Sequence, residues 1–508
     1  MDISLENEKY CSLKKSYDWT VEESVEAELS LPEYMPEILR IIKSQATPKI
    51  NSFTTVGERV TIDGSCELRM IYVGEDNCIY TFSQTRNFTR YCESSAFLSA
   101  EDVRVKTSLN YVNCRATNTK RAEIKAGVLI SAVAFEKTEE SILVSGNRKG
   151  IEEKKTEISA MSLGCKKSKM FSMSDTFSLE HDTAGFLVRA NAVCVLGETR
   201  KISNKIMLKG ETIVEIAYVP NEEKSVIRTV KRILPINQIL EFEGMEEHFT
   251  GDITLEVTAV DVIIKNDSQG EGRSLDASVC VNASITMWEQ KDLQIITDAY
   301  AINGKVDLTY QKMKLYSAVE ALRDTYIFKS EIDTSKTGVE YILDAFCEPS
   351  EPSLSFGDGV LAVIGTLKAV LLLKDSTGNI VTLEKLLDYR YERKSDCKSV
   401  ETNCVPNVIV SSFECVAKNN EHVDVKAELQ ISCSVFGETD IDAVTDITEC
   451  TPEEKVRKSA ITVYFPKREE SLWSIAKSYN TTVESIAFEN NIEGDTTGEL
   501  KMLFIPSV

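Results

Sequence analysis

Apolar and polar residues alternate along most of the chain, in runs bounded by Gly, Asn and Asp. Such runs at Ala122–Ala134, Leu275–Met287 and Val423–Val435 are typical of strands with one buried face. Many short runs of this kind predict a mainly β chain built from sandwiches or open barrels. Two segments, Pro36–Ser44 and Leu308–Ala321, depart from alternation, and their spacing predicts short helices.

The pattern changes near the C-terminus, where apolar residues recur three and four positions apart. Two short helices are predicted from these positions, which are Leu472, Ile475, Ala476 and Tyr479 in the first and Val483, Ile486 and Ala487 in the second. Ser471 is placed to cap the first helix, and Thr481 or Thr482 the second. Strand-like residues 461–465 and 502–505 flank the pair, so the sequence predicts a compact strand–helix–helix–strand unit.

The β-rich part of the chain repeats itself three times. Gly64, Gly210 and Gly365 lie 146 and 155 residues apart, and each opens a strand-like run. An alternating strand follows each glycine by about 60 residues, and a matching segment precedes it by about 40. This long period predicts tandem domains, each with a core of its own. The expected organisation is an N-terminal extension at 1–11, β-sandwich-like repeats at 12–165, 166–318 and 319–445, a linker at 446–458 and the C-terminal domain at 459–508.

Composition agrees with packed domains and disfavours anionic partners. At 508 residues the chain is long enough for about three or four domains, and its 42% hydrophobic and 27% charged residues are ordinary for globular proteins. Its net charge of −22 disfavours binding to nucleic acid or anionic lipid. The most compact basic run, 166–169, is interpreted as a solvated linker.

The N-terminus has no apolar signal region, and no apolar run approaches the length of a membrane span. We therefore expect a cytoplasmic protein. The 14 cysteines are scattered and form no CxxC pair, so reduced thiols are expected.

The chain shows no motif for catalysis, for a metal or for a cofactor. Its three histidines, His181, His248 and His422, have no ligand-like spacing around them, and a zinc site is not expected. Phosphate-binding glycine loops and the GxSxG nucleophile motif are absent from the sequence. Acidic pairs such as Glu246-Glu247 are interpreted as solvated surface. A Cys–His pair formed only in the folded chain stays open, and we expect no enzyme.

The C-terminal unit resembles the LysM domain. The residues that carry the resemblance are Leu472-Trp473-Ser474-Ile475-Ala476-Lys477-Ser478-Tyr479, Thr481-Thr482-Val483-Glu484-Ser485-Ile486, Asn490-Asn491-Ile492 and Ile505-Pro506. The resemblance implies a shallow groove between the first strand–helix loop and the second helix–strand loop, which binds N-acetylglucosamine polymers such as peptidoglycan. Two departures bear on that groove: Glu469-Glu470-Ser471 replaces Gly-Asp-Thr, and Pro-Gly before the last strand is missing. A glutamate in place of glycine obstructs the approach of a sugar.

The repeated body also resembles a known family. The segment Leu29–Ile42 and the run from Gly64 to Tyr72 are similar to the SPOCS domain of endospore-forming bacteria. Three such copies followed by LysM resemble the clostridial SipL-type spore-coat morphogenetic proteins. The resemblance implies a non-enzymatic scaffold in the mother-cell cytoplasm, which joins the coat basement-layer ATPase to the forespore surface through LysM.

Six residues on or near the groove loops are the expected contacts with a partner, namely Phe465, Lys467, Trp473, Tyr479, Phe488 and Asn490. Aromatic anchors ringed by polar residues are typical of binding hot spots. Trp473 follows Leu472 directly, so it points off the apolar stripe and is expected at the surface. Two alternatives remain: a peptidoglycan-binding protein of the spore cortex or cell wall, and a wall hydrolase that uses LysM for targeting.

Overall fold

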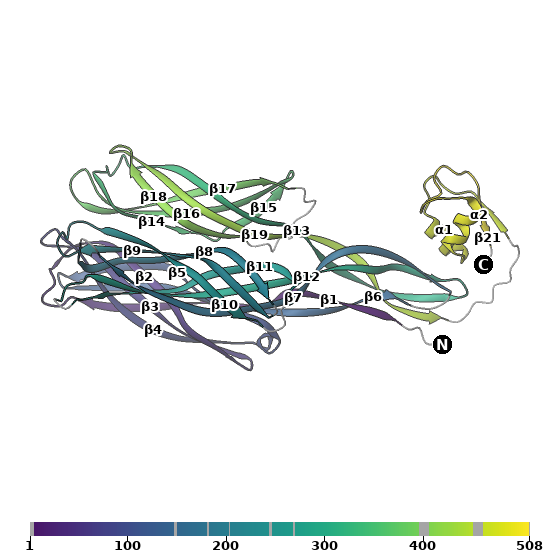
Figure 1. Cartoon of the computed structure of the whole chain (residues 1–508), viewed down its shortest axis with the longest axis horizontal. Coiled ribbons are helices and arrows are strands. Elements are labelled where there is room, and N and C mark those ends of the chain that lie inside the picture. Colours follow the sequence, from purple (N-terminus) through teal and green to yellow (C-terminus); the bar gives the residue numbers. More distant parts are fainter. Residues whose placement is uncertain are drawn as a thin grey trace.

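The protein is described here by a computed structural model, which covers residues 5–146, 150–179, 182–202, 204–242, 246–267, 270–395, 406–450 and 461–506, without the side chains of 318–320, 449 and 450. Within these residues the chain forms antiparallel strands almost throughout, and both α-helices lie near its C-terminal end (Figure 1). The predicted mainly β fold is confirmed.

Three successive parts of the chain fold into units with one strand order. Unit 1 contains β1 (Glu6–Ser30), β2 (Ile38–Val56), β3 (Arg59–Gly74), β4 (Ile79–Glu93), the 3-10 turn η1 (Ser95–Phe97), β5 (Ala100–Asn118) and β6 (Arg121–Ser145). Unit 2 contains β7 (Ile151–Ser178), β8 (Ala184–Ile202), β9 (Lys205–Pro220), β10 (Arg228–Glu241), β11 (Thr250–Lys265) and β12 (Ser274–Ala301). Unit 3 contains β13 (Lys305–Asp333), β14 (Tyr341–Pro349), β15 (Ser353–Gly357), β16 (Val360–Lys374), β17 (Ile380–Lys394), β18 (Asn407–Ala417) and β19 (His422–Cys450).

Each unit is a sandwich of two antiparallel sheets. The last strand lies between the first and the penultimate strand in one sheet, as in β1-β6-β5, and the other sheet is centred on β3, β9 or β16. Alternate residues of β6, such as Ile124, Val128 and Ile130, are buried and share one core with β3. This alternation is what one buried sheet face requires. Units 2 and 3 have equivalent cores.

Each of the repeated glycines lies where an aromatic ring or a backbone carbonyl comes very close to the strand. Gly64 pairs with Phe88, and Gly365 pairs with Tyr389, in the neighbouring strand. A Cβ atom at Gly64 would lie 2.3 Å from Phe88 Cζ, and one at Gly365 would lie 2.4 Å from Tyr389 Oη. At Gly210 the close neighbour is instead the carbonyl oxygen of Val195, at 2.4 Å. The glycines therefore leave room for an aromatic ring or for backbone that a side chain would displace.

The three units also share hydrophobic clusters. One, the junction cluster, joins one end of β3, β9 and β16 and their neighbours, and consists of Ile71, Val73, Ile79, Val188, Ala217, Val219, Ile227, Leu343, Val370, Leu372 and Ile380. A second joins the long strands β1, β6, β7, β12, β13 and β19 where they extend beyond the body as a narrow stalk (Figure 1). The sequence predicted a core for each repeat, and the structure adds clusters common to all three. The expected limits 165/166 and 318/319 lie inside the continuous strands β7 and β13, and the limits themselves stay predictions.

Three local predictions are wrong. Residues 36–44 and 308–321 form no helix, because they belong mainly to β2 and β13. Register shifts in β2, at Ile38/Arg40 and Ile41/Lys43, and in β13 interrupt strict alternation and produce an apolar spacing that resembles a helix. The basic run 166–169 is no linker, because it lies in the middle of β7.

The C-terminal unit forms as predicted from β20 (Ile461–Tyr464), α1 (Leu472–Tyr479), α2 (Val483–Asn490) and β21 (Leu503–Pro506). Thr482 caps α2 by accepting a hydrogen bond from the backbone N–H of Ser485 at 3.0 Å. Ser471 takes the N-cap position of α1, although its side chain makes no capping hydrogen bond. The two strands pair, with Val463 opposite Phe504.

Candidate functional site: the C-terminal module

The C-terminal module, residues 461–506, has a small core made by its two helices and two strands. The buried side chains are Leu472, Ile475, Ala476, Ile486, Leu503 and Ile505. The helical stripe and the closing strand therefore serve the core, as their spacing predicted. Binding must use the side chains that this core leaves outside.

The two loops of the expected groove are tied together by hydrogen bonds. Glu469 has φ of 56°, in the left-handed region that favours glycine, and its carboxylate accepts a hydrogen bond from the Thr496 hydroxyl at 2.8 Å. The Glu470 carboxylate accepts hydrogen bonds from the Tyr464 hydroxyl at 3.0 Å and from the Lys467 backbone N–H at 2.8 Å. The carboxylate of Glu469 thus lies between the strand–helix loop and the helix–strand loop.

Of the six expected contacts, four have exposed side chains. Phe465 is 72% exposed and Phe488 is 85% exposed, which is unusual for phenylalanine. Lys467 is exposed beside Phe465 on the loop after β20. Tyr479 is half-exposed, and its ring packs edge-on against Tyr464 at 5.7 Å between centroids. These side chains are available to a partner.

Asn490 has a structural role. Its side-chain amide donates to the carbonyl of Phe504 at 2.6 Å, and its side-chain carbonyl accepts from the Phe504 N–H at 2.7 Å. The side chain therefore completes the hydrogen bonding of β21 at one edge, as a neighbouring strand would. Asn490 positions β21, and its polar groups are occupied.

Trp473 is not at an open surface, contrary to the sequence prediction. Its indole Nε1–H donates to the Asp298 carboxylate at 2.9 Å, and its ring meets Tyr300 edge-on at 4.9 Å. Both partners belong to β12, at the tip of the stalk. The sequence carried no signal for this contact, because the residues are about 175 positions apart.

The outward face of the β20–β21 pair is apolar, which sequence reasoning missed. Its exposed large side chains are Ile461, Val463, Met502 and Phe504. The sequence could have indicated this face. In Ile461–Phe465 and Met502–Ile505 both the odd and the even positions carry apolar residues, so both faces of each strand are apolar. Together with Phe465 and Phe488, these residues make the module rich in exposed apolar side chains, a property typical of interaction surfaces.

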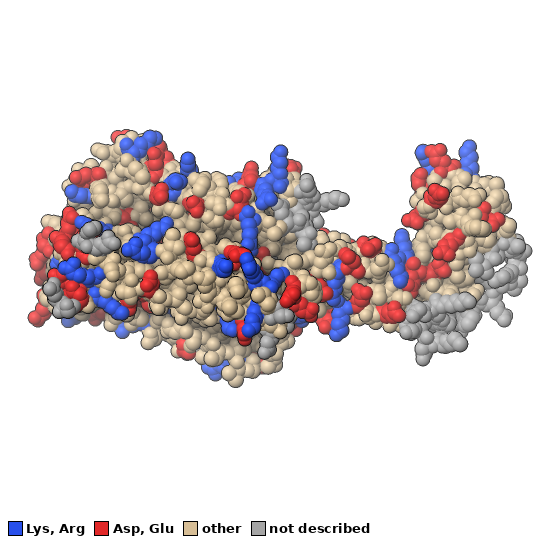
Figure 2. All heavy atoms as spheres, in the orientation of Figure 1, with Lys and Arg blue, Asp and Glu red and all other residues tan. Residues whose placement is uncertain are grey.

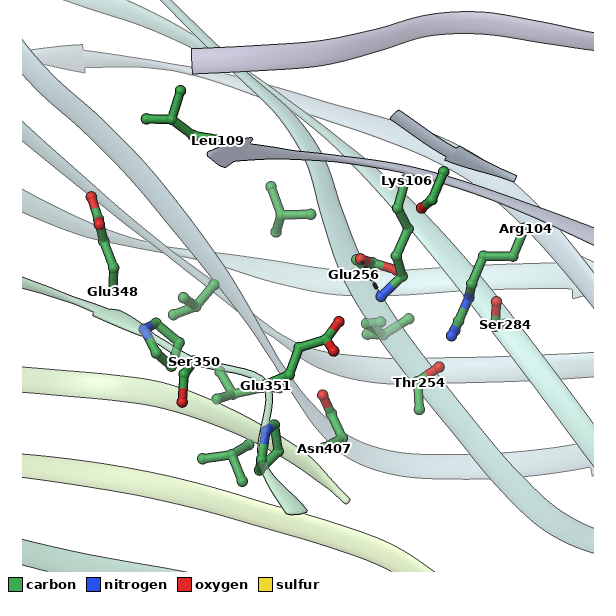
Figure 3. Close-up of a pocket in the computed structure, with 18 of the residues that line it drawn as sticks. Arg104, Lys106, Leu109, Thr254, Glu256, Ser284, Glu348, Ser350, Glu351 and Asn407 are labelled. Atoms are coloured by element: carbon green, nitrogen blue, oxygen red, sulfur yellow. Dashed lines mark ion pairs between the residues drawn. The ribbon is translucent and has the colours of Figure 1, made fainter. Parts of the chain in front are cut away.

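The body contains a second candidate, a cavity of about 3340 Å³ lined by all three units. Lys106 of β5 and Glu256 of β11 form a 3.0 Å ion pair across it, with Arg104 beside them and Glu351 of unit 3 facing the same space (Figure 3). Lys166 of the basic run is only 7% exposed, and its Nζ donates to the Thr286 hydroxyl at 3.1 Å. Burial lowers the pKa of Lys166. The lining mixes both signs of charge.

The described histidines lie beside carboxylates, and one buried thiol is held in its protonated form. His248 lies 3.4 Å from Glu289, and His422 lies 3.7 Å from Glu331, both near the surface, while His181 lies outside the described residues. Burial raises the pKa of the Cys66 thiol to about 12, which disfavours the reactive thiolate. Among the residues that the structure describes, no three His, Cys, Asp or Glu side chains are grouped to hold a metal ion.

The visible side of the body carries both signs of charge (Figure 2). Figure 2 shows Lys and Arg side chains interspersed with Asp and Glu over the visible side of the body. Given the net charge of −22, this distribution does not favour a polyanionic partner. In the described part of the chain, neither helix has the length and apolar character needed to cross a membrane.

Comparison with known families identifies two domains. Residues 37–117, which span β2 to β5, match the family described as SipL, SPOCS domain, and residues 467–501 match the LysM domain. No curated protein and no solved structure matches the chain. SPOCS and LysM are both non-catalytic domain families, and LysM is associated with peptidoglycan binding. The chain therefore has the SipL-type architecture, a SPOCS domain followed by a C-terminal LysM domain, and is a sporulation-related protein.

Proposed function

We propose that this chain is a non-enzymatic scaffold of endospore coat assembly. In this role its LysM module attaches to a protein, the coat basement-layer ATPase, at the forespore surface in the mother-cell cytoplasm. The observation that carries the proposal is the combination of the SPOCS domain with a C-terminal LysM domain, both of them non-catalytic domain families. Units 2 and 3 share the strand order of unit 1, which supports three SPOCS-like repeats.

The geometry of the module supports a protein partner over a glycan. A sugar chain in the family groove would have to lie between the two loops, where Glu469 binds Thr496. The exposed apolar and aromatic side chains of the module fit the core of a protein interface instead. Phe465 and Phe488 are the proposed anchors, with Lys467 and Tyr479 beside them.

The test compares capture of the purified coat ATPase by full-length variants. Phe465→Ala and Phe488→Ala are expected to weaken capture by ~10-fold or more, as loss of an aromatic hot spot does. Tyr34→Ala is the matched control, because Tyr34 is also 85% exposed but lies in unit 1. If both phenylalanine variants fold and bind like the wild type, the proposed surface is wrong.

The LysM match also supports a second function, peptidoglycan binding in the cortex or cell wall. Sedimentation with purified peptidoglycan separates the two, since the scaffold proposal expects little binding by the wild type. Glu469→Gly removes the carboxylate between the loops and suits the left-handed φ, so it is expected to fold and to increase sedimentation. Glu493→Gly, an exposed substitution on the same helix–strand loop, is its control. Strong sedimentation of the wild type would favour the glycan function.

A further inference from the structure

The LysM module is held against the tip of the stalk by a specific set of contacts. The Asp298 carboxylate accepts hydrogen bonds from Trp473 Nε1 at 2.9 Å and from Lys477 Nζ at 2.6 and 2.8 Å. The Tyr300 hydroxyl donates to the carbonyl of Thr481 at 2.7 Å. Hydrogen bonds to charged groups are the stronger ones, so Asp298 is the polar centre of this contact.

Strand β12 is shaped for the contact. Its pairing with β7 shifts register between Ile296 and Asp298, which marks a bulge, and bulges re-aim the side chains that follow them. Asp298 and Tyr300 are two residues apart and so project from the same face of the strand. The bulge and this spacing together direct both side chains toward the LysM module.

The contact also has an apolar centre. Tyr300 is 4% exposed and belongs to the same hydrophobic cluster as Leu472 and Ile475 of the module. Its ring meets the Trp473 indole edge-on, one of the favoured geometries for aromatic pairs. Asn480 adds a hydrogen bond to the carbonyl of Ala301 at 2.8 Å. A buried Tyr ring against a partly buried Trp, with hydrogen bonds around them, is the arrangement of an interface hot spot.

We propose that the stalk tip masks the Trp473 face of LysM, so that the stalk and the protein partner compete for this face. The inference rests on the proposed function and adds a regulatory contact to the same module. Phe465 and Phe488 stay exposed while the module is docked, whereas Trp473 is partly covered by the stalk and becomes fully accessible when the module leaves it. The apparent affinity of a partner that needs Trp473 is then reduced by the fraction of molecules in the docked state.

The masking is tested without any partner. Trp19→Phe and Trp288→Phe leave Trp473 as the single tryptophan of the full chain, so acrylamide quenching of its fluorescence reports its accessibility. Asp298→Ala in this background removes the acceptor of two LysM side chains, Trp473 and Lys477, and we expect the quenching constant to rise about threefold. Tyr300→Phe, which keeps the ring and removes one hydrogen bond, should raise it less. Asp292→Ala, an exposed position on the same strand, should leave it unchanged.

Competition is tested with the coat ATPase and the same variants. Asp298→Ala should tighten binding several-fold, and Trp473→Ala should cancel that gain. Unchanged quenching in a folded Asp298→Ala variant would overturn the docking. Raised quenching with unchanged affinity would overturn the competition. If no variant binds the ATPase, the proposed function and the competition both fail, while quenching alone still decides the docking.

Discussion

The junction cluster predicts that the three units open together at one end of the body. Leu371 and Leu372 are adjacent, fully buried residues of β16, but they point to opposite faces of the sheet. Leu371 belongs to the core of unit 3, whereas Leu372 belongs to the junction cluster with residues of units 1 and 2. Each substitution to alanine should cost about 2–5 kcal/mol of unfolding free energy, as buried Leu→Ala changes do.

The two substitutions should therefore lower the free energy of unfolding by similar amounts, but they should destabilise different segments of the chain. Hydrogen exchange under native conditions measures this distribution, since it reports local opening segment by segment. Leu371→Ala should lower protection mainly in the strands of unit 3. Leu372→Ala should also lower it in β3 and β9, whose residues Ile71 and Val219 pack in the same cluster. Loss of protection confined to unit 3 in the Leu372→Ala variant would refute the reasoning.

Three further predictions follow from buried polar groups and from one glycine. Arg189 pairs with Asp344 at 3.1 Å between units 2 and 3, so Arg189→Ala should cost about 3–5 kcal/mol in chemical denaturation, while replacing both residues with leucine should cost much less. Gly64→Ala should lower the melting temperature, because the added Cβ clashes with the ring of Phe88. In the double variant Gly64→Ala/Phe88→Ala the loss of stability should be smaller than the sum of the two single losses, and an additive result would exclude the clash. Burial and nearby carboxylates of LysM and β7 raise the pKa of Glu152, so its charge disfavours docking at neutral pH, and acrylamide quenching of Trp473 should fall as the pH falls toward the raised pKa. Glu152→Gln should abolish that pH dependence above pH 4.5, the ordinary pKa of the group.

At still lower pH the docking contact should weaken, because Asp298 then loses its charge. Hydrogen bonds from Lys477 and Trp473 lower the pKa of Asp298 against the effect of burial, so the contact is stabilised while the carboxylate is charged. That stabilisation is present above the ordinary pKa of 3.8 and is lost as the pH falls through the lowered value. Docking should therefore be strongest between the pKa values of Glu152 and Asp298.

Local periodicity in the sequence was enough to predict the LysM helices and the threefold repeat. The LysM helices, the Thr482 cap and the buried stripe of Leu472 and Ile475 depend on contacts between residues three or four apart, which the sequence displays directly. The repeat was readable for a similar reason. Gly64 and Gly365 recur because units 1 and 3 place an aromatic ring against the same strand position, and Gly210 recurs in unit 2 where backbone comes equally close.

Alternation failed where strands bulge. The register shifts in β2 and β13 changed the apolar spacing, and the sequence then predicted helices at 36–44 and 308–321. The prediction of a solvated linker at 166–169 was also wrong, because the burial of this run depends on a distant strand. Lys166 is buried by pairing with Thr286 of β12, a partner 120 residues away that no local pattern announces.

Only the tertiary structure decided how the repeats join and what Trp473 contacts. The junction cluster gathers residues from three units, and Asp298 and Tyr300 meet LysM from the tip of the stalk. Spacing along a helix tells which side a residue faces, but not what lies opposite. Trp473 was expected at the surface, but residues of β12 cover it in part. Contacts between distant segments leave no periodic signal, because they depend on how whole sheets and modules pack.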